Sequence, residues 1–70
     1  MFINVADIFT EEIINLNNVV NISKEDEPGC MHEIVFHTNV DTEIRFSWRI
    51  QKERDEAYRS ILEDLRSNIL

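Results

Sequence analysis

The clearest pattern in this chain is a strict alternation of polar and apolar residues from Glu43 to Ile50. Such alternation predicts a β-strand with one buried face and one solvent-exposed face, and it puts Ile44, Phe46 and Trp48 together on the buried face. The period then changes to that of a helix, over residues 51–68. Its apolar stripe consists of Ile50, Ala57, Tyr58, Ile61, Leu62, Leu65 and Ile69. The pattern therefore predicts a strand that leads directly into an amphipathic helix.

Shorter apolar runs upstream predict further strands. We expect strands at about residues 2–8, 12–15, 19–23, 31–38 and 43–49, followed by a helix at about 51–68. Residues 5–12 are ambiguous, because a strand, a turn and a short helix each fit them. Leu16-Asn17-Asn18 favours a tight turn, since asparagine tolerates left-handed backbone and bonds its own main chain. Pro28 and Gly29 mark a loop.

Together these elements predict a single α+β domain over residues 1–70. We expect an antiparallel meander of about four strands, with one C-terminal amphipathic helix packed across one face. A hairpin loop centred on residues 40–42 would place Phe36 opposite Phe46 and Ile34 opposite Trp48. The same register would place Glu33 opposite Arg49 as a charge pair. Trp48 is then expected to be buried under the helix.

The composition limits how such a domain is stabilised. The chain has 70 residues and one cysteine, Cys30, so no disulfide can form within it. A lone thiol without a basic, apolar leader favours a reducing, cytoplasmic location. No apolar run approaches the about 20 residues that cross a bilayer. A core of this size rarely supplies more than about 3–5 kcal/mol of net stability, so small domains often depend on a partner subunit.

Charge is distributed unevenly along the chain. The formal net charge is −7, and residues 1–43 carry nine acids against one base, whereas residues 44–70 carry five acids against six bases. A negative field repels phosphate backbones, so nucleic-acid binding is unlikely. The loop acids Glu25, Asp26 and Glu27 form a candidate acidic partner surface. They support an alternative function, a phage-type acidic inhibitor that mimics DNA and blocks a basic nucleic-acid-binding site.

Three residues raise the question of a metal or catalytic site. Cys30, His32 and His37 are the soft ligands that lie close in sequence. His32 and His37 differ in parity, so a regular strand points them to opposite faces. Cys30 with His32 is the one nominal nucleophile–base pair, and the surrounding acids would raise the pKa of the thiol. We therefore expect no enzyme activity, no metal and no cofactor.

Surplus apolar residues give the leading functional hypothesis. The doublets Ile13-Ile14 and Val19-Val20 each place one member away from the helix, and Met31 and Val35 add to that second face. One helix cannot cover both faces of a sheet. Ile13, Val19, Met31 and Val35 are therefore a candidate interface, and the sequence favours a small acidic, non-enzymatic protein-interaction module that forms a homodimer.

Overall fold

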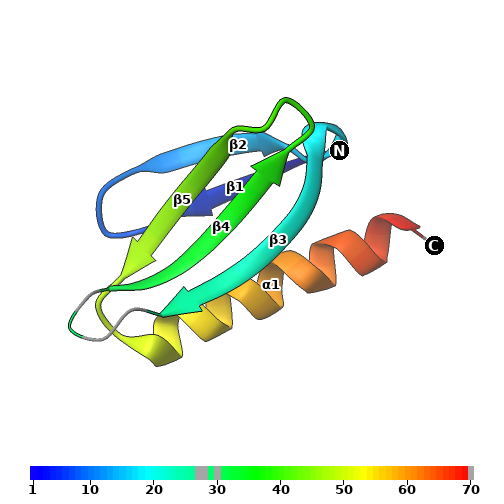
Figure 1. The fold of residues 1–70 in the computed structure, drawn as a ribbon. Helices are drawn as coiled ribbons and strands as arrows, with labels where there is room; N and C mark the ends of the chain where they lie inside the picture. Colours follow the sequence, from blue (N-terminus) through cyan, green and yellow to red (C-terminus); the bar gives the residue numbers. More distant parts are fainter. Residues whose placement is uncertain (27–28, 30, 70) are drawn as a thin grey trace.

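A computed structural model of the chain describes residues 1–26, 29 and 31–69 (Figure 1). It has an α+β fold, which confirms the predicted class. The strands are β1 (Phe2–Ala6), β2 (Glu11–Asn15), β3 (Val19–Asp26), β4 (His32–Thr38) and β5 (Glu43–Trp48), and a 3₁₀ turn (Leu16–Asn18) separates β2 from β3. The helix α1 (Gln51–Ile69) follows β5 and packs on the strands.

The strands form two sheets, and this differs from the single meander that the sequence predicts. β1 pairs with β2 in an antiparallel hairpin, and β3, β4 and β5 form a second antiparallel sheet in that order. Asp7 ends β1 early, because one of its carboxylate oxygens accepts hydrogen bonds from the backbone N–H groups of Phe9 and Thr10, both at 2.8 Å. Residues 7–10 are therefore a turn, and this resolves the ambiguity of residues 5–12.

The predicted turn at residues 16–18 separates the two sheets. The side chain of Asn15 accepts a hydrogen bond from the backbone N–H of Asn17 at 3.1 Å and so caps the 3₁₀ turn. The backbone N–H of Leu16 donates to the carbonyl of Met1 at 2.9 Å, and the Leu16 side chain is buried. The turn thus both redirects the chain toward β3 and contributes to the core.

The register of the β4–β5 hairpin is shifted by two residues from the predicted one. Ile34 lies opposite Phe46 and Phe36 opposite Ile44, while Glu33 faces Ser47 and not Arg49. The loop is one residue nearer the N-terminus than expected. Thr38 pairs with Thr42 through a backbone hydrogen bond of 3.0 Å, and Asp41 takes the left-handed conformation with φ of 61°. This is a three-residue hairpin loop, and a shift of two residues leaves every side chain on its predicted face.

The core lies between the two sheets and α1. It is formed by apolar side chains from four strands, the 3₁₀ turn and the helix: Ile3, Val5, Ile14, Leu16, Ile34, Phe36, Phe46, Trp48 and Ile61. Phe36 and Phe46 pack edge to face with ring centroids 5.7 Å apart. Trp48 is 6 % exposed, so its predicted burial is confirmed. Ile50 is 55 % exposed and does not belong to the packing stripe of the helix.

Candidate interaction groove

The two edges of the β3–β4–β5 sheet differ. At the β5 edge, the carboxylate of Asp7 accepts a hydrogen bond from the backbone N–H of Ser47 at 2.7 Å, and the N–H of Ile8 donates to the Ser47 carbonyl at 3.4 Å. Burial opposes the charged form of Asp7, but the N–H groups of Ser47, Phe9 and Thr10 outweigh it and lower the pKa of this carboxyl. The β1–β2 turn thereby covers the β5 edge.

The β3 edge is open. β3 pairs with β4 on one side, and within residues 1–26, 29 and 31–69 no strand pairs with its other side. The pairing shifts between Val19 and Asn21, which leaves Val20 as a bulged residue that is 69 % exposed. Beyond the bulge the strand is regular to Asp26. Unpaired backbone groups on such an edge are ready to accept another strand.

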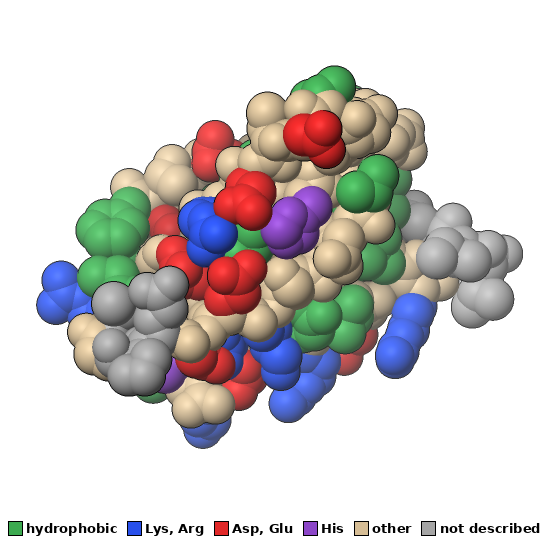
Figure 2. Space-filling view, viewed as in Figure 1, with side chains coloured by type: hydrophobic (Ala, Val, Ile, Leu, Met, Phe, Trp, Pro, Cys, Tyr) green, Lys and Arg blue, Asp and Glu red, His purple; other side chains and the backbone are tan. Residues whose placement is uncertain are grey.

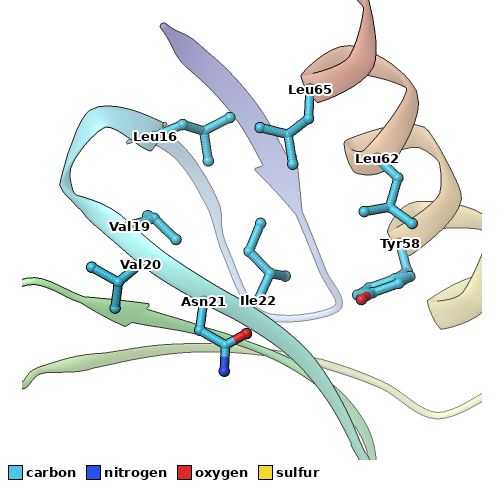
Figure 3. A pocket seen from close by; sticks show the side chains of 8 residues that line it. All are labelled: Leu16, Val19, Val20, Asn21, Ile22, Tyr58, Leu62 and Leu65. Atoms are coloured by element: carbon cyan, nitrogen blue, oxygen red, sulfur yellow. The ribbon is translucent and has the colours of Figure 1, made fainter. Parts of the chain in front are cut away.

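A groove of about 320 Å³ lies between this open edge and α1. Figure 3 shows Ile22 pointing from β3 toward the helix, and Tyr58 and Leu62 extending from the helix toward β3. We call this cavity the β3–α1 groove, and it is lined by Leu16, Val19, Val20, Asn21, Ile22, Tyr58, Leu62 and Leu65. Tyr58, Leu62 and Leu65 have i, i+4 and i+7 spacing, so they form one flank of the helix. All three are half-buried, and the groove is therefore largely apolar but still accessible.

Charges of both signs border the groove. The Lys24 ammonium lies 5.1 Å from the centre of the Tyr58 ring and 3.8 Å from the Asp55 carboxylate. Arg59, Glu63 and Arg66 line the adjoining hollow with them. Figure 2 shows Lys and Arg side chains along the position of α1. This border carries three bases and two acids, in a chain with a net charge of −7.

The outer face of the same sheet carries a network of acidic, basic and histidine side chains (Figure 2). The guanidinium of Arg45 contacts the carboxylates of Glu43 at 2.8 Å, Glu33 at 3.1 Å and Glu25 at 3.4 Å. The hydrogen bond to Glu43 is the main cause of a raised pKa for Arg45. His37 adds to the network through Glu43, at 3.5 Å. These contacts join β3, β4 and β5 on the face away from the helix.

A second arginine, Arg54, lies on the helix side. It is 1 % exposed and donates hydrogen bonds to the carboxylates of Asp26 at 3.1 Å and Asp55 at 2.7 Å. It also donates to the backbone carbonyls of Glu25 at 3.3 Å and Glu33 at 3.2 Å, which lie opposite each other on β3 and β4. Arg54 therefore ties the first turn of α1 to the end of the β3–β4 pair.

The acids around Arg54 titrate below their usual range. The hydrogen bond from Arg54, followed by that from His32, lowers the pKa of Asp26, and the Asp26–His32 distance is 2.6 Å. The hydrogen bond from Arg54 likewise lowers the pKa of Asp55. For Arg54 itself, burial disfavours the charge, but the two carboxylates outweigh it and raise its pKa. Arg54, Asp26 and Asp55 are therefore all charged at neutral pH, with one guanidinium between two carboxylates.

The structure does not bring the four candidate interface residues together. Ile13 is on β2 and is 73 % exposed, whereas Val19 is half-buried and packs against the core. Met31 is half-buried, and Val35 is fully buried on the outer face of the sheet. The exposed member of the second doublet is Val20, because the bulge turns it outward. The exposed members of the two doublets therefore lie apart, Ile13 on the β1–β2 hairpin and Val20 at the β3–α1 groove.

The acidic candidate surface is partly neutralised within the chain. Glu25 contacts Arg45, and Asp26 contacts both Arg54 and His32. Glu27 lies outside the described residues. The two carboxylates that can be placed are thus engaged by internal cations.

The candidate ligands are separated in the described part of the chain. His32 bonds to Asp26, on the helix side of β4, whereas His37 bonds to Glu43 on the outer face, as their parity predicts. Cys30 lies outside the described residues. Among the others, no group of three or more His, Cys, Asp or Glu residues is placed to hold a metal ion. No helix in the described part of the chain is both long and apolar enough to cross a membrane.

Sequence reasoning missed two residues that organise the fold, Arg54 and Asp7. Arg54 had a signal, because it precedes Ala57, Tyr58 and Ile61 by three, four and seven residues and so shares their helical face. A charge on an apolar stripe indicates a buried polar partner. Asp7 had a weaker signal, as an aspartate that begins a turn, and its contact with β5 spans 40 residues of sequence.

In comparisons with known proteins, no family model matches this chain, and no curated protein or solved structure shows significant similarity to it.

Proposed function

We propose that the chain is a small, non-enzymatic protein-interaction module that forms a homodimer through the β3–α1 groove. The observation that carries this proposal is the open β3 edge beside an accessible apolar groove of about 320 Å³. The opposite edge of the same sheet is covered by Asp7 and Ile8. β3 carries a bulge at Val20 and charged residues from Lys24 to Asp26, and such features usually protect an exposed edge. The stretch from Asn21 to Ser23 between them is uncharged and lies beside apolar side chains, which favours a binding role.

The size of the domain supports the same proposal. A core built from about ten buried side chains leaves the isolated chain only marginally stable, and a partner subunit adds buried area. A stable interface buries about 800 Å² per partner. The groove, the β3 edge and the adjoining flank of α1 together offer a continuous surface for it.

One exposed valine and one exposed isoleucine give a matched test of the proposed interface. Val20 lines the groove and is 69 % exposed, whereas Ile13 lies on the β1–β2 hairpin and is 73 % exposed. Neither substitution by aspartate opens a cavity, so both variants should fold. Sedimentation equilibrium at micromolar concentration should show a dimer for the parent chain and for Ile13→Asp. Val20→Asp should raise the dimer dissociation constant about tenfold or more.

The outcomes separate the possible interfaces. A parent chain that remains an 8.3 kDa monomer at low and moderate salt would contradict the homodimer. A dimer lost in Ile13→Asp but kept in Val20→Asp would place the interface on the hairpin and contradict the role of the groove. Because each subunit carries −7, the dimer should tighten as salt screens the repulsion.

The alternative function, an acidic inhibitor that mimics DNA, has less support. A mimic presents unpaired carboxylates to a basic site, whereas Glu25 and Asp26 are each bonded to an internal arginine. Neutralising both acids should leave self-association intact. If the chain instead blocked a nucleic-acid-binding protein, and this effect disappeared in Glu25→Gln/Asp26→Asn, the alternative would be preferred.

A further inference from the structure

We propose that two copies join their β3 strands in antiparallel fashion across a two-fold axis at Ser23, which turns two three-stranded sheets into one of six strands. This inference rests on the proposed function and adds its geometry: the occupant of the groove is a second copy of this chain, and the backbone of β3 takes part. The regular stretch available for pairing runs from Asn21 to Asp26.

The faces of β3 restrict the possible registers. Ile22 and Lys24 point toward α1, since Ile22 packs on the core and Lys24 contacts Tyr58. Ser23 and Glu25 point to the outer face, where Glu25 meets Arg45. In an antiparallel pair, residues directly opposite each other have their side chains on the same face. A symmetric pair therefore has a residue, and not a peptide bond, at the two-fold axis.

Charge then selects among the residues that could lie on the axis. Lys24 on the axis would face Lys24 of the partner subunit, and Glu25 would face Glu25 of the partner subunit, and both arrangements are unfavourable. With Ile22 on the axis, only one residue on each side could pair before the bulge at Val20 interrupts the strand. With Ser23 on the axis, residues 21–25 pair without a like-charge contact.

The same symmetry brings the two helices together. A two-fold axis perpendicular to the sheet keeps both copies of α1 on one side, with their Tyr58, Leu62 and Leu65 flanks turned toward each other across the new pair of strands. The border of the groove combines bases with the acids Asp55 and Glu63. With three bases and two acids it carries charges of both signs that can pair across the axis, in a chain whose total charge otherwise opposes self-association.

Disulfide cross-linking tests the axis. In a Cys30→Ser background, Ser23→Cys places one thiol at the proposed axis. Ser60→Cys is the matched control, because Ser60 is exposed on α1 and borders the hollow formed with β1, away from the groove. With oxidised glutathione, Ser23→Cys should become mostly covalent dimer on a non-reducing gel, and Ser60→Cys should remain mostly monomer.

A second variant pair tests the register in case Ser23→Cys weakens the dimer. Asn21 should lie opposite Glu25 of the partner subunit. A mixture of Asn21→Cys and Glu25→Cys chains should therefore cross-link at least several-fold more than either variant alone.

Each result decides between the proposals. If sedimentation shows a dimer but neither Ser23→Cys nor the mixture cross-links above the Ser60→Cys control, β3 pairing is wrong and the homodimer stands. Equal cross-linking of Ser23→Cys and Ser60→Cys would reflect random collision and would also overturn the pairing. A monomeric parent chain removes both the pairing and the proposed function.

Discussion

The two faces of the β3–β4–β5 sheet use different chemistry, and on each side one buried residue does not match its surroundings. The inner face packs Ile34, Phe36, Phe46 and Trp48 into the core, all at 6 % exposure or less. The outer face carries a network of charged side chains around Arg45. The exceptions are a buried arginine on the helix side and a buried valine on the outer face.

The buried valine is Val35, with no exposed surface although it lies opposite Arg45 on β5 and Ser23 on β3. Arg45 reaches from β5 to Glu25 on β3, so its side chain crosses over β4. Long charged side chains can cover apolar surface with their hydrocarbon portions while the charged ends remain in water. The charge network, and not a second layer of structure, therefore covers this position.

The buried arginine is Arg54, and it contacts fewer carboxylates than Arg45 does. Arg45 meets three acids, but its side chain is 41 % exposed, so each contact competes with water. Arg54 meets two acids and two backbone carbonyls at 1 % exposure. Removing it would take this donor from the two carbonyls, while Asp26 would keep His32 and Asp55 would keep Lys24. The comparison teaches that burial, and not the number of ion pairs, decides what an arginine contributes.

The largest effect should come from the apolar inner face. Trp48→Ala removes a large buried side chain and should lower the free energy of unfolding by about 3–5 kcal/mol, close to the whole stability of so small a domain. Urea denaturation measures this, with Trp48→Phe as a milder control. Trp48 is the one tryptophan of the chain, so its emission should report an apolar environment. A water-like emission maximum in the folded protein would contradict the burial.

A smaller effect should separate the two arginines. Arg54→Met keeps much of the side-chain volume but removes the hydrogen bonds to Asp26, Asp55 and two carbonyls, and it should cost about 2–3 kcal/mol. Arg45→Met should cost less than about 1 kcal/mol, because its pairs are exposed. Urea denaturation of both variants at one ionic strength makes the comparison. If the two variants lost equal free energy of unfolding, or if Arg45→Met lost more, burial would not decide how much an arginine stabilises this fold.

The smallest effect should appear at acid pH. Arg54 lowers the pKa of Asp26 and Asp55 in the folded protein, below the ordinary value of about 3.9. The resulting stabilisation is complete above the unfolded pKa and is lost as pH falls through the folded pKa. The free energy of unfolding, measured from pH 6 to pH 2, should therefore decrease less steeply below about pH 4 for Arg54→Met than for the parent chain. Because the pKa of Asp7 is also lowered, the free energy of unfolding should still decrease with pH in both proteins. The same pH dependence in Arg54→Met and the parent chain would contradict the coupling to Arg54.

The local sequence predicted much of the fold for identifiable reasons. The alternation through Ile44, Phe46 and Trp48 placed these three residues on one face, and that face is the one that packs into the core. The helix begins at Gln51, as its periodicity predicted, and Ile61 of its apolar stripe is buried in the core. Leu16-Asn17-Asn18 predicted the turn that the structure shows as 3₁₀. Each of these depends on residues that are close in sequence.

The errors arose where the local pattern is compatible with more than one arrangement. The hairpin register differed by two residues because Asp41 accepts a left-handed backbone, and both registers keep the same faces. The single meander became two sheets because the 3₁₀ turn (Leu16–Asn18) separates β2 from β3, while Asp7 bonds the β1–β2 turn to Ser47 on β5. The candidate interface dispersed because parity alone does not reveal a bulge at Val20 or a charged cover over Val35.

The sequence by itself determined the class of the fold, the order of its elements and the inward faces of its strands and helix, because periodicity and turn chemistry act over a few residues. The tertiary structure decided which edge of the sheet is closed, where Arg54 is buried and where the β3–α1 groove opens. These features depend on contacts between residues about 20 to 40 positions apart, such as Asp7 with Ser47 and Arg54 with Asp26. The pattern of residues over a few positions does not predict such contacts, because they form only when distant segments come together.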